Sequence, residues 1–165
     1  MTSILKVDTI QTTAGGAPTA GDLGLNDTGT VLQVQTVVNR NSATNSGSSI
    51  FTNSGLYVDF TPKKSDSTII VHAQSHIYRN ALGHNFHRVI NQSTGTASGN
   101  RGGRDANGVY HESVPIVWKD TSHNSTAQRR YEIQFADRDN SGSASLYFND
   151  GGGYESGITV FEIAG

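Results

Sequence analysis

The stretch STIIVHAQSHIYRN (residues 67–80) decides the fold of this 165-residue chain. Its side chains alternate with the two-residue period of a β-strand, in which successive side chains point to opposite faces. One face carries Ile69, Val71, Ala73, Ser75 and Ile77, and the other carries Ile70, His72, Gln74, His76 and Tyr78. The second face is mixed rather than clearly polar, so we expect Ile70, His72, His76 and Tyr78 to contact another subunit. The alternative is a surface with scattered hydrophobic residues, which are common.

Seven further segments with a strand-like pattern surround this one. They are short, rich in β-branched and aromatic residues, and separated by turn-type stretches, the longest being residues 39–49 and 93–108. The seven segments are residues 30–38, 55–61, 86–92, 112–119, 129–136, 144–149 and 158–164. Pro115 indicates an edge strand or a bulge, because proline cannot donate a ladder hydrogen bond. The sequence predicts an all-β domain over residues 31–165, a jelly-roll-like two-sheet sandwich of about 8–10 antiparallel strands.

The composition excludes several classes of protein. The chain has no cysteine, and therefore no disulfide framework, thiolate nucleophile or cysteine-based zinc site. A net charge of −2 with only 16% charged residues does not fit nucleic-acid binding, which needs a basic surface. No apolar run reaches the roughly 20 residues of a membrane helix, so we expect no membrane insertion. We also see no secretory signal peptide.

Residues 1–30 differ from the rest of the chain. Ile4, Val7 and Ile10 recur at every third residue, which matches neither a strand nor a full helical face. The Gly-, Ala- and Thr-rich stretch TTAGGAPTAGDLGLNDTG (residues 12–29) follows them and cannot bury enough surface to fold alone. We expect residues 1–30 to form an extended arm that docks on a neighbouring protein through these three apolar residues. A frayed terminus is the alternative.

Six histidines raise the question of a metal site. His72 and His76 share a strand face but lie about 13 Å apart along it, too far to bind one ion together. A ring of either histidine around a trimer axis is an alternative. DRDNSG (residues 137–142) resembles the start of a calcium loop, with carboxylates at Asp137 and Asp139, but Phe148 stands where the twelfth-position acidic residue belongs. The alternative is an ordinary hairpin turn, because Asp and Asn are also common in turns, where their side chains hydrogen-bond to the backbone.

No other motif indicates catalysis. RGGRDANG (residues 101–108) lacks the spacing of a P-loop or a dinucleotide-binding turn, and no nucleophile motif or carboxylate cluster is visible. We therefore expect no catalytic residue, no metal and no cofactor. Tyr110 and Tyr154 lie in or beside predicted loops and are the candidates for receptor contact, since aromatic rings at loop tips stack on sugars or proteins. Trp118 lies on an alternating strand, and we expect it in the core.

The order of several short motifs resembles a known group of proteins. SILKVDTIQ (3–11), AGDLGL (20–25) and GTVLQVQ (29–35) resemble the amino-terminal signature of small virion appendage proteins of marine tailed bacteriophages, including cyanophages. Four later motifs resemble successive parts of the β-domain that follows in those proteins. They are GLYVDFTPKKSDSTIIV (55–71), HRVINQSTG (87–95), TSHNSTAQRRYEIQF (121–135) and SGITVFEIAG (156–165). The order of the motifs is the specific part of this resemblance.

The resemblance implies a non-enzymatic tail-fibre or other virion structural protein, of a kind that is often trimeric. We predict a homotrimeric fibre, tip or capsid-decoration module, assembled in the host cytoplasm and anchored by residues 1–30 to other virion proteins of the capsid or the tail. Two alternatives stay open. One is a tail-fibre tip that binds a host surface glycan through loops 101–110 and 150–156, and the other is a polysaccharide depolymerase, which needs clustered carboxylates that the sequence does not show.

Overall fold

Each strand in the described part of the chain belongs to one of two antiparallel sheets. The computed structural model describes residues 28–81, 83–102, 104–105, 110–140, 145–149 and 155–165, and within these ranges it contains ten strands and no helix. The strands are β1 (Val31–Asn39), β2 (Ala43–Asn45), β3 (Thr52–Phe60), β4 (Thr68–Arg79), β5 (Gly83–Asn91), β6 (Arg104–Asp105), β7 (Tyr110–Asp120), β8 (Arg129–Asp137), β9 (Leu146–Phe148) and β10 (Ser156–Ile163).

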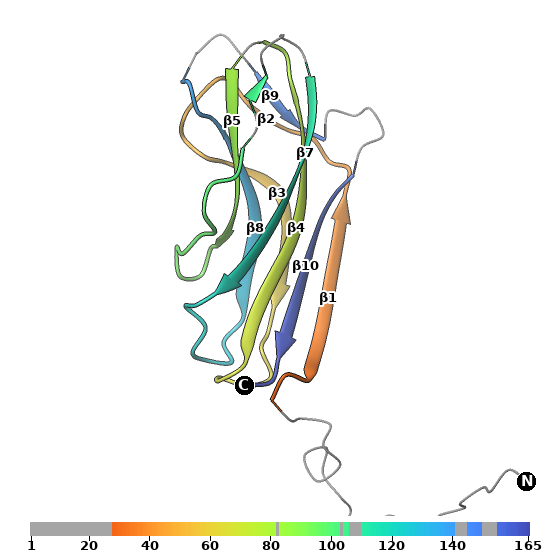
Figure 1. Ribbon diagram of the computed structural model, residues 1–165, viewed down its shortest axis with the longest axis vertical. Helices are drawn as coiled ribbons and strands as arrows, with labels where there is room; N and C mark the ends of the chain where they lie inside the picture. Colours follow the sequence, from red (N-terminus) through yellow and green to blue (C-terminus); the bar gives the residue numbers. More distant parts are fainter. Residues whose placement is uncertain (1–27, 82, 103, 106–109, 141–144, 150–154) are drawn as a thin grey trace, which may run out of the picture.

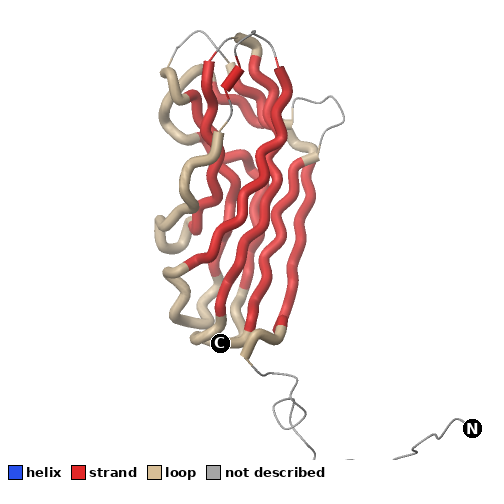
Figure 2. The backbone as a smooth tube through the Cα atoms, viewed as in Figure 1, coloured by secondary structure: helices blue, strands red, loops and turns tan. Residues whose placement is uncertain are grey.

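The strands follow the order of a jelly roll. Sheet A joins β1, β10, β4 and β7, and the short strands β9 and β2 extend it beside the far end of β4. Sheet B joins β3, β8, β5 and β6. When β2 and β9 are left out, eight strands remain, which can be renumbered 1 to 8 along the chain. Their order is then 1-8-3-6 in sheet A and 2-7-4-5 in sheet B, which is the order that two interlocked Greek keys produce. Figure 1 shows the two sheets packed face to face, and Figure 2 shows that the described chain consists of strands, turns and loops. The predicted all-β sandwich is confirmed.

The core lies between the two sheets. Inward-facing side chains of both sheets form one cluster, as the period-two pattern requires. The cluster contains Ile69, Val71, Ala73 and Ile77 of β4, Val114 and Ile116 of β7, Ile158 and Val160 of β10, Leu146 and Phe148 of β9, Leu56, Val58 and Phe60 of β3, Tyr131, Ile133 and Phe135 of β8, and Val89 of β5. Trp118 packs partly buried against it, with its ring 6.0 Å from that of Tyr131. The expectation that Trp118 belongs to the core is confirmed.

Local irregularities separate the structure from the sequence pattern. The register of β1 shifts between Val31 and Gln33, so Leu32 falls out of the simple alternation. The register of β3 shifts between Asn53 and Tyr57, around Gly55, whose φ of 75° is in the left-handed region that favours glycine. The strands β2 and β6 lie within segments predicted as loops. Strands of two or three residues are too short to show a periodic pattern.

The predicted amino-terminal arm falls almost entirely outside the described residues. Ile4, Val7 and Ile10 belong to residues 1–27, so the arm stays a prediction. The described chain begins at Thr28 and joins the sandwich at the lower end of β1 in Figure 1. There Gly29 donates its N–H to the Ala164 carbonyl (2.9 Å), and Ala164 donates to the Thr30 carbonyl (2.8 Å). The described chain therefore starts beside its own carboxyl terminus.

We expect the core to depend on Ile133 far more than on an exposed residue of similar size. Ile133 is fully buried, so Ile133→Ala is expected to lower the free energy of unfolding by about 2–5 kcal/mol, through lost apolar burial and the cavity left behind. Val117→Ala is the control, because Val117 is 62% exposed and its loss is expected to cost less than about 0.5 kcal/mol. Chemical denaturation of both variants measures the difference, and equal losses would contradict this placement of the core.

Candidate functional site

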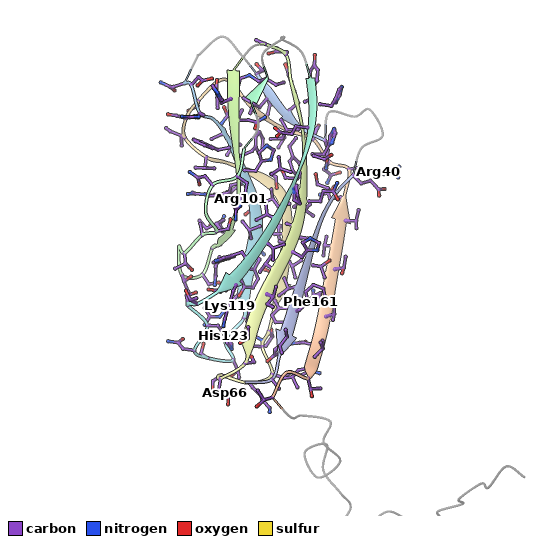
Figure 3. All side chains as sticks on the ribbon, viewed as in Figure 1. Arg40, Asp66, Arg101, Lys119, His123 and Phe161 are labelled. Atoms are coloured by element: carbon purple, nitrogen blue, oxygen red, sulfur yellow. The ribbon has the colours of Figure 1, made fainter. Side chains whose placement is uncertain are left out.

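The outer face of sheet A is the main candidate surface. It consists of the side chains of β1, β10, β4 and β7 that point away from sheet B. The strand register sets them in rows: Val34, Phe161, Ile70 and Lys119 in one; Thr36, Thr159, His72 and Val117 in the next; and Val38, Gly157, Gln74 and Pro115 in the third. Lys119 is the one charged side chain in these three rows. Figure 3 shows side chains standing on this sheet, with Phe161 and Lys119 labelled.

Exposed apolar side chains concentrate on this face. Among the described residues, six large hydrophobic side chains are exposed, and four of them stand here: Val31 (52%), Val34 (52%), Val38 (55%) and Val117 (62%). Ile70, Phe161 and Ile163 are half-buried between them. A contiguous apolar surface on a β-sheet is typical of a contact with another protein rather than of a wetted face.

The four predicted interface residues all belong to the outward side of β4, but in two environments. Ile70 is half-buried and His72 exposed, both in the rows described above. His76 is only 4% exposed, and its Nδ1 lies 2.8 Å from the Ser113 hydroxyl. The ring of Tyr78 packs at a tilt against those of His111 and Tyr147, with ring centres 5.0 and 5.6 Å away. Ile70 and His72 therefore offer surface to a partner, whereas β7 and β9 already cover much of His76 and Tyr78.

A shallow depression interrupts the apolar rows at Gly157. Its volume is about 280 Å³, and its lining residues are Thr36, Val38, His72, Ala73, Gln74, Glu155, Ser156, Gly157 and Thr159. A side chain at residue 157 would stand where the hollow is. A Cβ built there would lie 3.8 Å from its nearest neighbours, an ordinary contact distance. The backbone therefore does not require glycine at this position, and glycine instead gives the outer face a recess.

A buried histidine lies between the sheets. His87 of β5 is completely buried, with Nδ1 2.8 Å from the Ser75 hydroxyl and Nε2 3.2 Å from the Asn85 side-chain oxygen. Burial, with a smaller effect of nearby His76, lowers the pKa of His87 from 6.5 to about 3. His87 is therefore neutral at physiological pH. Its two hydrogen-bond partners, Ser75 and Asn85, are neutral, and a carboxylate oxygen of Glu112 lies 3.9 Å from Nε2.

The two carboxylates of the calcium-like motif already have partners within the protein. Asp137 and Arg79 are both fully buried and form an ion pair, with distances of 3.0 and 3.3 Å between the guanidinium and the carboxylate oxygens. The same guanidinium donates to the carbonyls of Ala81 and His84, each at 2.8 Å. Asp139 accepts the backbone N–H of His84 at 2.6 Å and lies 3.0 Å from its ring Nδ1. Arg79 thus takes the position that a cation would need.

Two more carboxylates hold the opposite end of the sandwich. Fully buried Glu162 accepts the backbone N–H groups of Lys63 and Lys64 at 2.8 and 2.9 Å and the Ser67 hydroxyl at 2.8 Å. Burial opposes ionisation, but these hydrogen bonds outweigh it and lower the pKa of Glu162. Asp120 likewise accepts the Tyr131 hydroxyl at 2.8 Å. These carboxylates fix loops, because their oxygens are taken by the protein itself.

The other predicted site residues are only partly described. Tyr154 lies outside the described residues. Tyr110 begins β7, where it pairs with Arg79 at the end of β4. The receptor contact predicted for these two tyrosines stays a prediction. In the described part of the chain, no group of three or more His, Asp or Glu side chains is arranged to hold a metal ion. The same part contains no helix with the length and apolar character needed to cross a lipid bilayer.

Comparisons with known proteins found similarity among solved structures. No protein-family model and no curated protein matches the chain. The crystal structure of the infectious bursal disease virus VP2 subviral particle is similar over 81% of this chain and 33% of that chain, with 12% identity and a TM-score of 0.48. Structures of the Gx and Gt strains of infectious bursal disease virus match 81% of this chain at 11% and 13% identity. They do so over 37% and 38% of their own chains, with TM-scores of 0.39 and 0.34. The chain thus spans little more than a third of these proteins, and the strand order described above defines its fold.

The buried state of His87 predicts a specific pH dependence. The folded-state pKa lies below the ordinary value, so the unfolded chain binds more protons between pH 6.5 and 3. Stability is therefore complete above pH 6.5 and falls as the pH drops through this window, by about 2 kcal/mol already at pH 5. Urea denaturation from pH 7.5 to 5 measures this slope. It is expected to disappear in His87→Gln and to persist in His72→Gln, and an unchanged slope in His87→Gln would contradict the assignment.

The Arg79–Asp137 pair predicts insensitivity to calcium. Adding calcium chloride is expected to leave the melting temperature unchanged, because a guanidinium already neutralises Asp137. Asp137→Asn leaves Arg79 as a buried, uncompensated charge, and we expect it to cost about 3–5 kcal/mol of stability. Asp139→Asn is the matched control and is expected to cost less, since the Asp139 side chain is 38% exposed. A rise in melting temperature with calcium that Asp137→Asn removes would show a cation site instead.

Proposed function

We propose that the protein is a structural component of a bacteriophage particle that assembles as a homotrimer through the outer face of sheet A. The observation that carries this proposal is the exposed apolar surface on that face, with Ile70 and His72 near its centre. Water covers this surface in an isolated chain, and burying it against identical chains is favourable by about 25 cal/mol per Å² of apolar area. The order of the sequence motifs supplies the virion context.

The composition of the outer face favours assembly over binding of a charged ligand. Three rows of β-branched, aromatic and uncharged polar side chains carry a single lysine, Lys119, near one side. Protein interfaces are depleted in charge at their centres and keep charged groups at the rim. The recess at Gly157 can receive a protruding side chain of a partner, and such shape complementarity allows close packing.

The proposal assigns opposite roles to the two ends of the sandwich. The arm of residues 1–30 attaches the module to another virion protein of the capsid or the tail. It joins the sandwich at the lower end of β1, beside the carboxyl terminus (Figure 1). The end with β2, β9 and the beginning of β7 then projects away from the particle, as a short fibre, tip or decoration knob. Tyr110 begins β7 at this projecting end.

Substitution on the outer face tests the trimer. We expect the purified protein to have the mass of a trimer in light scattering, and Ile70→Asp or His72→Asp to reduce it to a monomer, since each places a carboxylate inside the contact. Ile50→Asp is the matched control, because Ile50 is exposed (77%) and apolar but lies in the connection between β2 and β3. A wild-type monomer, or an Ile70→Asp variant that keeps the trimer mass, would overturn this interface.

Removal of the arm tests the attachment. A chain without residues 2–28 is expected to fold, with an unchanged circular dichroism spectrum, but to be missing from assembled particles. The full-length chain expressed in the same host is the control and is expected in the particles. Normal incorporation of the shortened chain would show that the sandwich, not the arm, makes the attachment.

A further inference from the structure

The edge strands of the two sheets differ in how well they are protected against pairing with a further strand. The last strand of a sheet presents backbone N–H and C=O groups that any other strand can pair with, and proteins block such edges with proline, charges, bulges or covering segments. The sandwich has four long edges, formed by β1 and β7 in sheet A and by β3 and β5 in sheet B. The short β6 covers only the beginning of β5.

Three of these edges carry a visible block. Strand β7 has Pro115 at its centre and Glu112 and Lys119 on either side. Strand β3 is broken by the register shift around Gly55. The edge of β5 is covered by the segment that follows it, where His87 and Arg101 exchange backbone hydrogen bonds of 2.5 and 2.8 Å.

Strand β1 carries no such block along most of its length. Its sequence VLQVQTVVN has no proline and no charge, and its register shift lies at its start, so residues 33–39 run regularly beside β10. Among the described strands β1 pairs only with β10, and Figure 1 shows it as the outermost strand on its side of the sheet. A regular, uncharged, valine-rich edge of this kind is an aggregation site unless another strand covers it.

We propose that β1 pairs in antiparallel fashion with β1 of a second copy of this chain, across a twofold axis at Thr36. The pairing joins the two copies of sheet A into one continuous sheet. Around Thr36 the sequence is close to symmetric for the outward side chains. Val34 of one copy faces Val38 of the other, Thr36 faces Thr36, and Val38 faces Val34.

This self-complementarity favours a second copy as the occupant. Each facing pair is β-branched with β-branched, a combination that stabilises antiparallel strands by about 0.2–1 kcal/mol per pair. No charged side chain lies within β1, so the axis brings no like charges together. A twofold contact between identical patches is also the commonest symmetry of soluble assemblies.

The twofold contact goes beyond the proposed trimer and uses other groups. The trimer contact uses side chains that stand on the face of sheet A, around Ile70 and His72. The twofold contact uses backbone groups of β1 in the plane of the sheet. Because the twofold axis sets the two copies antiparallel, their arms lie at opposite ends of the pair, and the contact joins chains that are not attached side by side to one particle. A single strand pair buries less area than a standard protein interface, so this contact is weak unless other contacts support it.

Cysteine cross-linking tests the pairing directly, because the full-length chain contains no cysteine of its own. In Thr36→Cys, the two thiols of a pair lie side by side across the axis, and a short bis-maleimide joins them into a covalent dimer. Ile50→Cys is the matched control, because Ile50 is 77% exposed and lies in the connection between β2 and β3, outside both proposed contacts. A thiol held beside its partner faces an effective concentration near the millimolar range, so at micromolar protein we expect the Thr36→Cys dimer to form at least ~10-fold faster.

A charge placed on the edge provides the second measurement. Val38→Lys in the Thr36→Cys background puts an ammonium group opposite Val34 of the partner copy and is expected to abolish the covalent dimer, whereas Ile50→Lys is expected to leave it. Circular dichroism shows that each variant is folded. Equal linking rates for Thr36→Cys and Ile50→Cys overturn the proposal. Linking of Val7→Cys to Thr36→Cys in a mixture, without Thr36→Cys self-linking, also overturns it and identifies a neighbour's arm as the occupant. The Ile70→Asp experiment reports on the trimer separately.

Discussion

Strand β4 is the element on which the rest of the sandwich depends. It hydrogen-bonds to β7 along one side and to β10 and then β9 along the other, so most of sheet A is assembled around it. Its inward side chains supply one wall of the core, and its outward side chains supply the middle of the exposed apolar face. A one-residue slip of β4 would exchange these two sets and remove the core and the contact surface together.

Buried polar groups lie at both ends of the sandwich, whereas the middle of the core is apolar. Arg79 and Asp137 neutralise each other at one end, and at the other Glu162 accepts a hydrogen bond from the backbone of Lys63 and Asp120 from the backbone of Ser122. Ion pairs and carboxylates this deeply buried add little net stability compared with apolar side chains, but removing one partner is costly. Their main effect is to define where strands end and loops begin. The fold thus combines nonspecific apolar burial in the middle with specific polar contacts at its ends.

The fold was predictable from the sequence because its strands are long and regular. Residues 67–80 alternate over the whole of β4. Pro115 indicated an edge strand or a bulge, and β7 is an edge strand. The short strands β2 and β6 were not predictable, since so few residues cannot display a period. The bulge in β1 was also not predictable, because it lies at the start of the strand, where too few residues precede it to show a change in the pattern. The exposed face was predictable only in part. The pattern groups Ile70, His72, His76 and Tyr78, but the cover over His76 and Tyr78 comes from β7 and β9, which are distant in sequence.

The buried charged groups at the two ends affect which parts of the chain can change in sequence. The Arg79 guanidinium holds the carbonyls of Ala81 and His84, and Glu162 holds the backbone of Lys63 and Lys64, so the residues where loops leave the strands are fixed by contacts to the sandwich itself. Lengthening a loop beyond such contacts costs only the slowly growing entropy of loop closure. The strands and their anchoring contacts can therefore stay the same while the loops at the ends of the sandwich change in length and sequence.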